Sequence, residues 1–240
     1  MDNPTPKPRY HALDALRGLS LLLMILHHLA VDLTLYGMVP QWLLDNPIVG
    51  VLQPLFGACF VALSGASSRF SRSTARRGLK ILLAAAAVTA ATAGMSWFLG
   101  QEVTVYFGIL HFLGVASLIY HVARPALDKI KLPGPIWLVL FLGAFCLFPR
   151  VADVPMALAP LGLMRPGFHS ADYYPLLPWI FIYFFGVWIA DCVKANHFPE
   201  AFYRFRCKPL EAVSKHSLWL YLLHQPIIMG LFQLWFLIAG

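Results

Sequence analysis

The chain has 240 residues, of which 59% are hydrophobic and 12% are charged, and its formal net charge is +7. A soluble domain carries about 25% charged residues, so this composition excludes an ordinary soluble domain and indicates lipid surroundings. The basic residues cluster between apolar segments, which argues against a nucleic-acid partner. We therefore predict one transmembrane domain over residues 1–240, since nothing outside the apolar segments is long enough to fold separately.

Seven apolar segments are long enough to span a bilayer as helices, which predicts an all-α integral membrane protein with a bundle of about seven transmembrane helices. The fifth is the shortest and the richest in Pro and Gly. The basic N-terminal stretch 1–11 leads into the first segment, which we interpret as a retained span and not as a cleaved signal peptide. The segments are Leu13–Leu35, Ile48–Ser68, Leu79–Leu99, Thr104–Val122, Leu132–Pro149, Tyr174–Val193 and Ser214–Ile238.

The placement of charge predicts the orientation of these spans. Of the 18 lysine and arginine residues, all but Arg150 and Arg165 lie before or early in the first span or in and beside the even-numbered connections. By the positive-inside rule, the N-terminus is cytoplasmic and the C-terminus is outside. The long outer connection 150–173 is apolar and contains proline, and it suits either an interfacial loop or a lid over an outer cavity.

The first span carries ionisable side chains at both ends. Arg17 and His28 are eleven residues apart, close to three helical turns, so they project from one face, and Asp32 extends that face by another turn. His27 points about 100° away and is expected to be structural. A face that is polar at both ends would be costly in lipid, so it should point into a bundle. The whole stripe is Asp14, Arg17, Leu21, Met24, His28 and Asp32.

The rise per residue predicts two polar layers at matching depths. Arg17 and Ser64 fall roughly 6 Å from the cytoplasmic edge of a core about 30 Å thick. His28 falls roughly 22 Å up, and His111 roughly 10 Å below the outer edge, so the two imidazoles should lie at similar depth. The other candidates are Arg69 and Arg76 in the inner layer, His224 and Gln225 near the middle, and Asp172 and Tyr173 at the outer mouth.

Each candidate also has a structural interpretation. Arg17 can snorkel to the headgroups or pair with Asp14. His111 and His224 can hydrogen-bond to neighbouring helices. Asp172 can cap the sixth span.

The two layers suit acyl transfer. A buried imidazole beside a carboxylate can take a proton from a hydroxyl or an amine. An arginine cluster with serine hydroxyls can hold phosphates. An apolar passage of roughly 16 Å between the layers suits a long donor such as acyl-CoA, with its phosphates inside and its thioester reaching outward. The four cysteines form no CxxC motif and no metal-like spacing with histidine, so no metal is expected.

Several stretches together resemble a known family. LDALRGLSLLLMILHHLAVDL looks like the first span of the transmembrane acyltransferase superfamily. With FVALSGASS, FGILHFLG, DYYPLLPW and HSLWLYLLHQP, it is similar to bacterial relatives of heparan-alpha-glucosaminide N-acetyltransferase. The resemblance implies an acetyl-CoA-dependent acetyltransferase that carries the acetyl group to an amino-sugar or other glycan-type acceptor, such as a glycolipid, on the outer side. It further implies a bacterial inner (plasma) membrane location.

The family pattern falls on residues that the depth argument selects, and roles follow for them. The catalytic residues expected are His28, with Asp32 or His111 setting its tautomer. The donor-binding residues expected are Arg17, Ser64, Arg69, Arg76, His224 and Gln225. The acceptor-binding residues expected are Asp172, Tyr173 and Trp179.

Several alternatives stay open from the sequence. A proton-coupled small-molecule transporter could use the same buried His and Asp residues, although no repeated halves or broken helices are visible. Transfer can be to nitrogen or oxygen, and it can pass through an acetyl-His28 intermediate or through a direct ternary complex. Faces that contain Trp and Gly permit a homodimer without specifying one.

Overall fold

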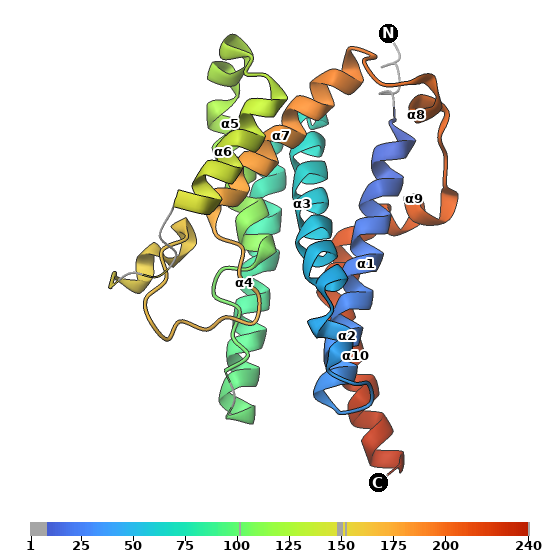
Figure 1. Ribbon diagram of the computed structural model, residues 1–240, viewed down its shortest axis with the longest axis vertical. Coiled ribbons are helices and arrows are strands. Elements are labelled where there is room, and N and C mark those ends of the chain that lie inside the picture. The colour runs from blue at the N-terminus through green and yellow to red at the C-terminus, as the bar shows by residue number, and fades with distance from the viewer. Residues whose placement is uncertain (1–8, 101, 148–150, 152, 240) are drawn as a thin grey trace. The chain divides into compact units, whose positions relative to one another are not determined.

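The computed structural model describes residues 9–100, 102–147, 151 and 153–239, and the regular structure of these residues is helical apart from isolated bridges (Figure 1). The long α-helices are α1 (His11–Leu35), α3 (Pro47–Phe70), α4 (Thr74–Leu99), α5 (Ile109–Ile130), α6 (Gly134–Leu147), α7 (Leu176–Lys194) and α10 (Ser217–Ala239). The short elements are α2 (Trp42–Asp45), the 3₁₀-helix η1 (Met156–Leu161), α8 (Glu200–Arg204) and α9 (Lys208–Lys215).

Six of these helices are long and apolar enough to cross a membrane: α1, α3, α4, α5, α7 and α10. The predicted fifth span corresponds to α6, which has 14 residues and is shorter than the roughly 20 that a straight crossing needs. An all-helical membrane fold is thus confirmed. The Pro149 end of the predicted fifth span lies outside the described residues, as do Lys7 and Arg150 from the charge pattern.

The predicted fourth span begins too early, and it also ends too early, at Val122, whereas α5 continues to Ile130. α5 starts at Ile109 and not at Thr104, because extended backbone precedes it. The Val105 N–H donates to Thr92 Oγ1, and the Val105 carbonyl accepts from Thr89 Oγ1, so hydroxyls of α4 satisfy this backbone. Such partners are distant in sequence, and hydropathy along the chain does not report them.

The described chain divides into two compact units, and the division falls within α3. Unit 1 comprises residues 1–60 and 196–240, and unit 2 comprises residues 61–195. The expectation of a single domain stays a prediction.

In unit 1, α1 packs against α9 and α10 and also contacts α2 and α8 (Figure 1). The closest approach is at Gly18, where a β-carbon would collide with the backbone carbonyl of Leu210 in α9. Leu21, in the middle of the predicted stripe, is fully buried. The stripe therefore faces the neighbouring helices of its unit, as the burial cost of its charged ends predicts.

In unit 2, α4 packs against α5, and α6 packs against α7 (Figure 1). The end of α3 crosses α7 at two glycines. A β-carbon on Gly65 would collide with the Tyr183 carbonyl, and one on Gly186 would collide with the Ala62 carbonyl. Small residues thus let the two backbones approach closely, which is common between membrane helices.

Candidate functional site

Four of the predicted site residues, two from the first span and two from the last, meet between α1 and α10. We call them the imidazole cluster: His28, Asp32, His224 and Gln225. The His28 and His224 ring centroids are 5.1 Å apart. Gln225 Nε2 donates to Asp32 Oδ2 over 2.8 Å, and Asp32 is only 8% exposed. A buried carboxylate, a hydrogen-bonding amide and two facing imidazoles therefore lie in one place.

The hydrogen bonds of His224 indicate its tautomer. His224 Nδ1 lies 2.6 Å from the Tyr221 carbonyl oxygen, which can only accept. Nδ1 therefore carries the proton, and in the neutral ring Nε2 carries the basic lone pair. The backbone of α10 in this way presents a nitrogen of His224 that can accept a proton.

The expectation that Asp32 sets the tautomer of His28 is not met. Asp32 accepts its side-chain hydrogen bond from Gln225, and in the part of the chain described here no hydrogen bond joins it to His28. The nearest rings to His28 are instead His224 and His27, the latter with its centroid 6.2 Å away. The i, i+4 spacing placed Asp32 and His28 on one face of α1. It could not predict that Gln225 of α10 would donate a hydrogen bond to the Asp32 carboxylate.

Arg17 lies at the N-terminal end of the stripe, which the charge pattern predicts to be cytoplasmic, and its surroundings are polar. Its Nη1 donates to Asp14 Oδ1 over 3.2 Å and to Ser214 Oγ of α9 over 3.3 Å. Asp14 also accepts from Arg9 Nε. The pairing with Asp14 considered from the sequence is thus present, and the Arg17 side chain is 18% exposed.

In unit 2, Ser64 belongs to a polar chain that includes Arg77. Arg77 donates from Nη2 to Ser64 Oγ and from Nη1 to Ser68 Oγ, each over 3.0 Å. Ser68 Oγ lies 2.5 Å from the Tyr183 hydroxyl, which lies 3.1 Å from Ser117 Oγ. Ser117 donates to a backbone carbonyl, so each hydroxyl can donate onward and every polar group is satisfied.

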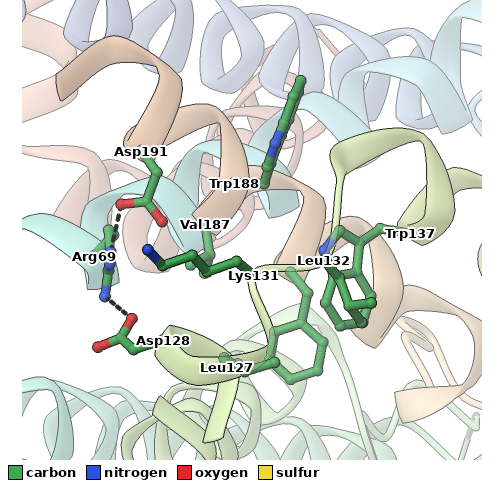
Figure 2. Close-up of a pocket in the computed structure, with 10 residues that line it drawn as sticks. Arg69, Leu127, Asp128, Lys131, Leu132, Trp137, Val187, Trp188 and Asp191 are labelled. Carbon is green, nitrogen blue, oxygen red and sulfur yellow. Dashed lines mark hydrogen bonds and ion pairs between the residues drawn. The ribbon is translucent and has the colours of Figure 1, made fainter. Parts of the chain in front are cut away.

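Arg69 and Arg76 have contrasting surroundings in unit 2. Arg69 Nε and Nη1 each lie 2.6 Å from a carboxylate oxygen, of Asp191 and Asp128 respectively (Figure 2). Nη1 also donates to the Tyr120 hydroxyl. Arg76 is exposed. The two arginines therefore differ in the charge they can offer to an anion.

His111 lies in the first turn of α5, so the depth counted for it from Thr104 is wrong. The Gly108 N–H donates to His111 Nδ1, which leaves the proton of the neutral ring on Nε2. Nε2 lies 3.1 Å from Thr89 Oγ1, which donates to the Val105 carbonyl. Both ring nitrogens are thus engaged in holding the start of α5, which fits the structural interpretation given to His111 above.

Asp172 and Tyr173 lie at the end of the connection 150–173, Trp179 lies in the first turn of α7, and each contacts another part of unit 2. Asp172 Oδ2 accepts from the Ile109 N–H over 2.8 Å, so it caps α5 and not the sixth span as considered above. The Tyr173 hydroxyl donates to the Ala159 carbonyl over 2.7 Å, and burial raises its pKa to about 12. The Trp179 ring packs 5.6 Å from Phe141.

Several residues that complete these sites have no role in the prediction from sequence. Arg77 has no role in the predicted inner layer, although Ser64 and Ser68 at i, i+4 indicate one polar helix face that an arginine could contact. Asp128 and Asp191 are acidic residues that lie beside lysine and arginine at the ends of two apolar spans, a charge pattern that could have indicated ion pairs.

The comparisons with known proteins agree with the resemblance found in the motifs. The family model described as "Heparan-alpha-glucosaminide N-acetyltransferase, catalytic" matches residues 9–226, which is most of the chain and includes parts of both units. Searches of curated proteins and of solved structures gave no significant match. Nothing in the fold or in these comparisons favours the transporter alternative.

Proposed function

Because the chain belongs to the heparan-alpha-glucosaminide N-acetyltransferase catalytic family, we propose that it moves an acetyl group from cytoplasmic acetyl-CoA to a glycan-type acceptor at the outer side of a membrane. Family membership and six apolar helices make it an integral membrane acetyltransferase of this type. The donor, the acceptor and the dependence on histidine are the proposal, and so is a location in a bacterial plasma membrane.

The observation that carries the proposal is the imidazole cluster. Acyl transfer needs a base that is close to the reacting group and sheltered from water. His28 and His224 face each other, and the hydrogen bond that fixes the His224 tautomer leaves a basic nitrogen there. We assign His28 as the general base, with His224 beside it to share the proton, and Asp32 and Gln225 as positioning residues.

The acceptor amine or hydroxyl attacks the thioester carbonyl carbon while His28 takes its proton, and the new C–N or C–O bond forms. The C–S bond then breaks, and CoA leaves as a thiolate that takes the proton back from the imidazolium. In the covalent variant, a neutral His28 nitrogen first attacks the thioester carbon and CoA leaves as a thiolate. The acceptor then attacks acetyl-His28, the C–N bond to His28 breaks, and the acceptor's proton passes to the CoA thiolate.

Donor binding is proposed for residues in both units, each to be tested separately. Arg17 and Arg76 are proposed to meet CoA phosphates, and Ser64 to contact the donor arm. Arg69 can meet a phosphate only if the phosphate replaces one of its two carboxylate partners. The acceptor-binding residues proposed are Asp172, Tyr173 and Trp179. His111 stays proposed as a catalytic residue beside His28.

The test is acetyl transfer by purified protein in liposomes, with labelled acetyl-CoA outside and the acceptor trapped inside. Glucosamine offers an amine, whereas N-acetylglucosamine offers only hydroxyls, so the pair separates N- from O-transfer. His28→Ala should lower transfer about 100-fold or more, because general-base catalysis contributes about that much. His27→Ala is the matched control, since it removes the adjacent imidazole and should keep most of the activity.

Equal activity of the His28→Ala variant and the unmodified protein would contradict the role of His28. Labelled acetyl-CoA without acceptor separates the two mechanisms, because only the covalent one leaves label on the protein. Saturating acetyl-CoA should also raise the melting temperature. No thermal shift together with no transfer to either sugar would overturn the proposed donor.

A further inference from the structure

Unit 2 contains a pocket of about 500 Å³ that the proposed reaction does not use as a whole (Figure 2). It lies where α3, α5 and α7 approach one end and α6 begins, so its walls come from four helices and the α5–α6 connection. The lining residues are Arg69, Leu127, Asp128, Lys131, Leu132, Trp137, Phe184, Val187, Trp188 and Asp191.

The charged lining carries two positive and two negative side chains. Arg69 uses two of its nitrogens for one oxygen each of Asp128 and Asp191. Among the described residues, the second oxygen of Asp191 accepts no hydrogen bond, and the Lys131 amine makes no ion pair. Figure 2 shows that amine reaching toward the side of the pocket where Arg69 and Asp191 lie. One acceptor and one cation are thus left for a ligand.

The opposite wall is aromatic and held in place by packing. Trp137 is buried, and its ring lies 5.0 Å from that of Phe184. A β-carbon on Gly134 would collide with the Trp188 ring, so α6 begins directly against this indole. Indole faces attract an ammonium group, most strongly where water is excluded.

The position of the pocket along the helices suits a lipid. Arg69 is the penultimate residue of α3, and Asp128 and Asp191 lie in the last turns of α5 and α7. The ends of membrane-spanning helices lie at the headgroup level, where tryptophan is enriched. A ligand at this level can keep its charges in the pocket and its acyl chains along the apolar helices.

We propose that this pocket binds a zwitterion with an ammonium and a phosphate group, as in the headgroup of phosphatidylethanolamine. The ammonium pairs with the second oxygen of Asp191 and lies against Trp188, while the phosphate pairs with Lys131. A purely anionic headgroup would meet the two carboxylates, and a purely cationic one would leave Lys131 unpaired. The balanced lining therefore favours a ligand that carries both charges.

The experiment is lipid titration of the delipidated, detergent-solubilised full chain, followed by native mass spectrometry. Phosphatidylethanolamine should bind at least 10-fold more tightly than phosphatidylglycerol. Lys131→Asn keeps a residue that tolerates the left-handed backbone at this position (φ 50°) and should lower that affinity at least 10-fold. Lys129→Asn, an exposed lysine on the same helix end that does not line the pocket, is the matched control and should bind as before.

Three further measurements keep the proposal falsifiable. Trp188→Ala should also weaken binding, and the melting temperature of each variant separates lost binding from lost folding. Soluble phosphoethanolamine distinguishes the source, since equal affinity for it would keep the zwitterion site but exclude the lipid. Equal binding of phosphatidylglycerol, no effect of Lys131→Asn in a folded protein, or displacement of the lipid by CoA would overturn the proposal.

Discussion

The Asp32 carboxylate of α1 is buried, and the Gln225 amide of α10 donates to it from nearly two hundred residues away in sequence. A buried carboxylate that loses its donor costs more free energy than the hydrogen bond itself contributed, since it stays desolvated. Replacing one partner alone should therefore destabilise the protein more than the loss of the hydrogen bond itself, because the other partner stays buried without it.

Gln225→Ala should lower the free energy of unfolding by about 1–3 kcal/mol, because it leaves the Asp32 carboxylate without that donor. Adding Asp32→Asn should recover part of the loss, since a neutral amide is less costly to bury than a charge. Thermal unfolding in detergent measures both. Gln233→Ala, an exposed glutamine of the same helix, is the control, and equal losses for Gln225→Ala and Gln233→Ala would contradict the argument.

A second buried carboxylate, that of Glu211 in α9, lies outside the membrane spans and predicts how the stability of the protein depends on pH. Glu211 Oε2 lies 2.8 Å from His11 Nδ1, and this hydrogen bond and the charge of His11 lower the Glu211 pKa from its ordinary value of 4.5 against the opposing effect of burial. A lowered pKa in the folded state stabilises the protein above pH 4.5, and the stabilisation is lost as the pH falls through the folded-state pKa.

Glu211→Gln should therefore have a lower melting temperature than the unmodified protein at pH 7, and the difference should shrink as the pH falls below 4.5. The measurement is thermal unfolding in detergent between pH 3 and pH 8. Glu200→Gln serves as the control, because Glu200 is a largely exposed residue of α8 whose ion pair contributes little. A difference that stays constant over this range would show that His11 does not stabilise the ionised carboxylate.

At the level of elements, the crossing of α3 and α7 depends on glycines, whereas Gly94 of α4 meets no such requirement. Gly65 and Gly186 each face a backbone carbonyl of the other helix at a distance that no β-carbon can occupy. Gly94 of α4 has nothing within 4 Å of an added β-carbon and is exposed. The same substitution should therefore have opposite effects at these positions.

Gly65→Ala should lower the free energy of unfolding by about 1–3 kcal/mol, since the helices must separate to admit a methyl group. Gly94→Ala should instead be neutral or stabilise by up to about 1 kcal/mol, because alanine is the better helix former. Thermal unfolding of the two variants side by side decides this. A neutral Gly65→Ala variant would show that the helices do not approach as closely as described.

At the level of the whole molecule, the pairing of the first and last spans bears on the number of crossings. Their contacts run in the same order along both helices: His28 faces His224, and Tyr36 packs against Phe232. α1 and α10 are therefore parallel. Successive spans cross a membrane in alternating directions, so a first and a last span that run in the same direction imply an odd number of crossings. Besides the six long apolar helices, α6 is then the seventh, which supports the predicted total of seven.

The predicted orientation can be tested with reporter fusions in a bacterial host. A fusion of alkaline phosphatase after residue 239 should be active, and a green fluorescent protein at the same place should be dark, because the C-terminus is predicted outside. Fusions at residues 131–133, in a predicted cytoplasmic connection, should give the reverse. A fluorescent C-terminal fusion would contradict the assignment.

The sequence alone determined the parts of this protein that depend on local properties. Hydropathy over about 20 residues predicted the spans to within about five residues, apart from the end of α5, because lipid demands a continuous apolar helix. Helical periodicity placed Arg17, His28 and Asp32 on one inward face. The family motifs indicated the acetyltransferase class that the family match supports.

The tertiary structure decided everything that depends on partners distant along the chain. It paired Asp32 with Gln225, gave Arg69 two carboxylates, and used His111 and Asp172 to begin α5. No spacing rule within one helix predicts these contacts, because a buried polar group takes whichever donor or acceptor the packed helices bring to it. The sequence therefore identified which polar residues enter the bundle, and only the packing of the helices decided what each one contacts.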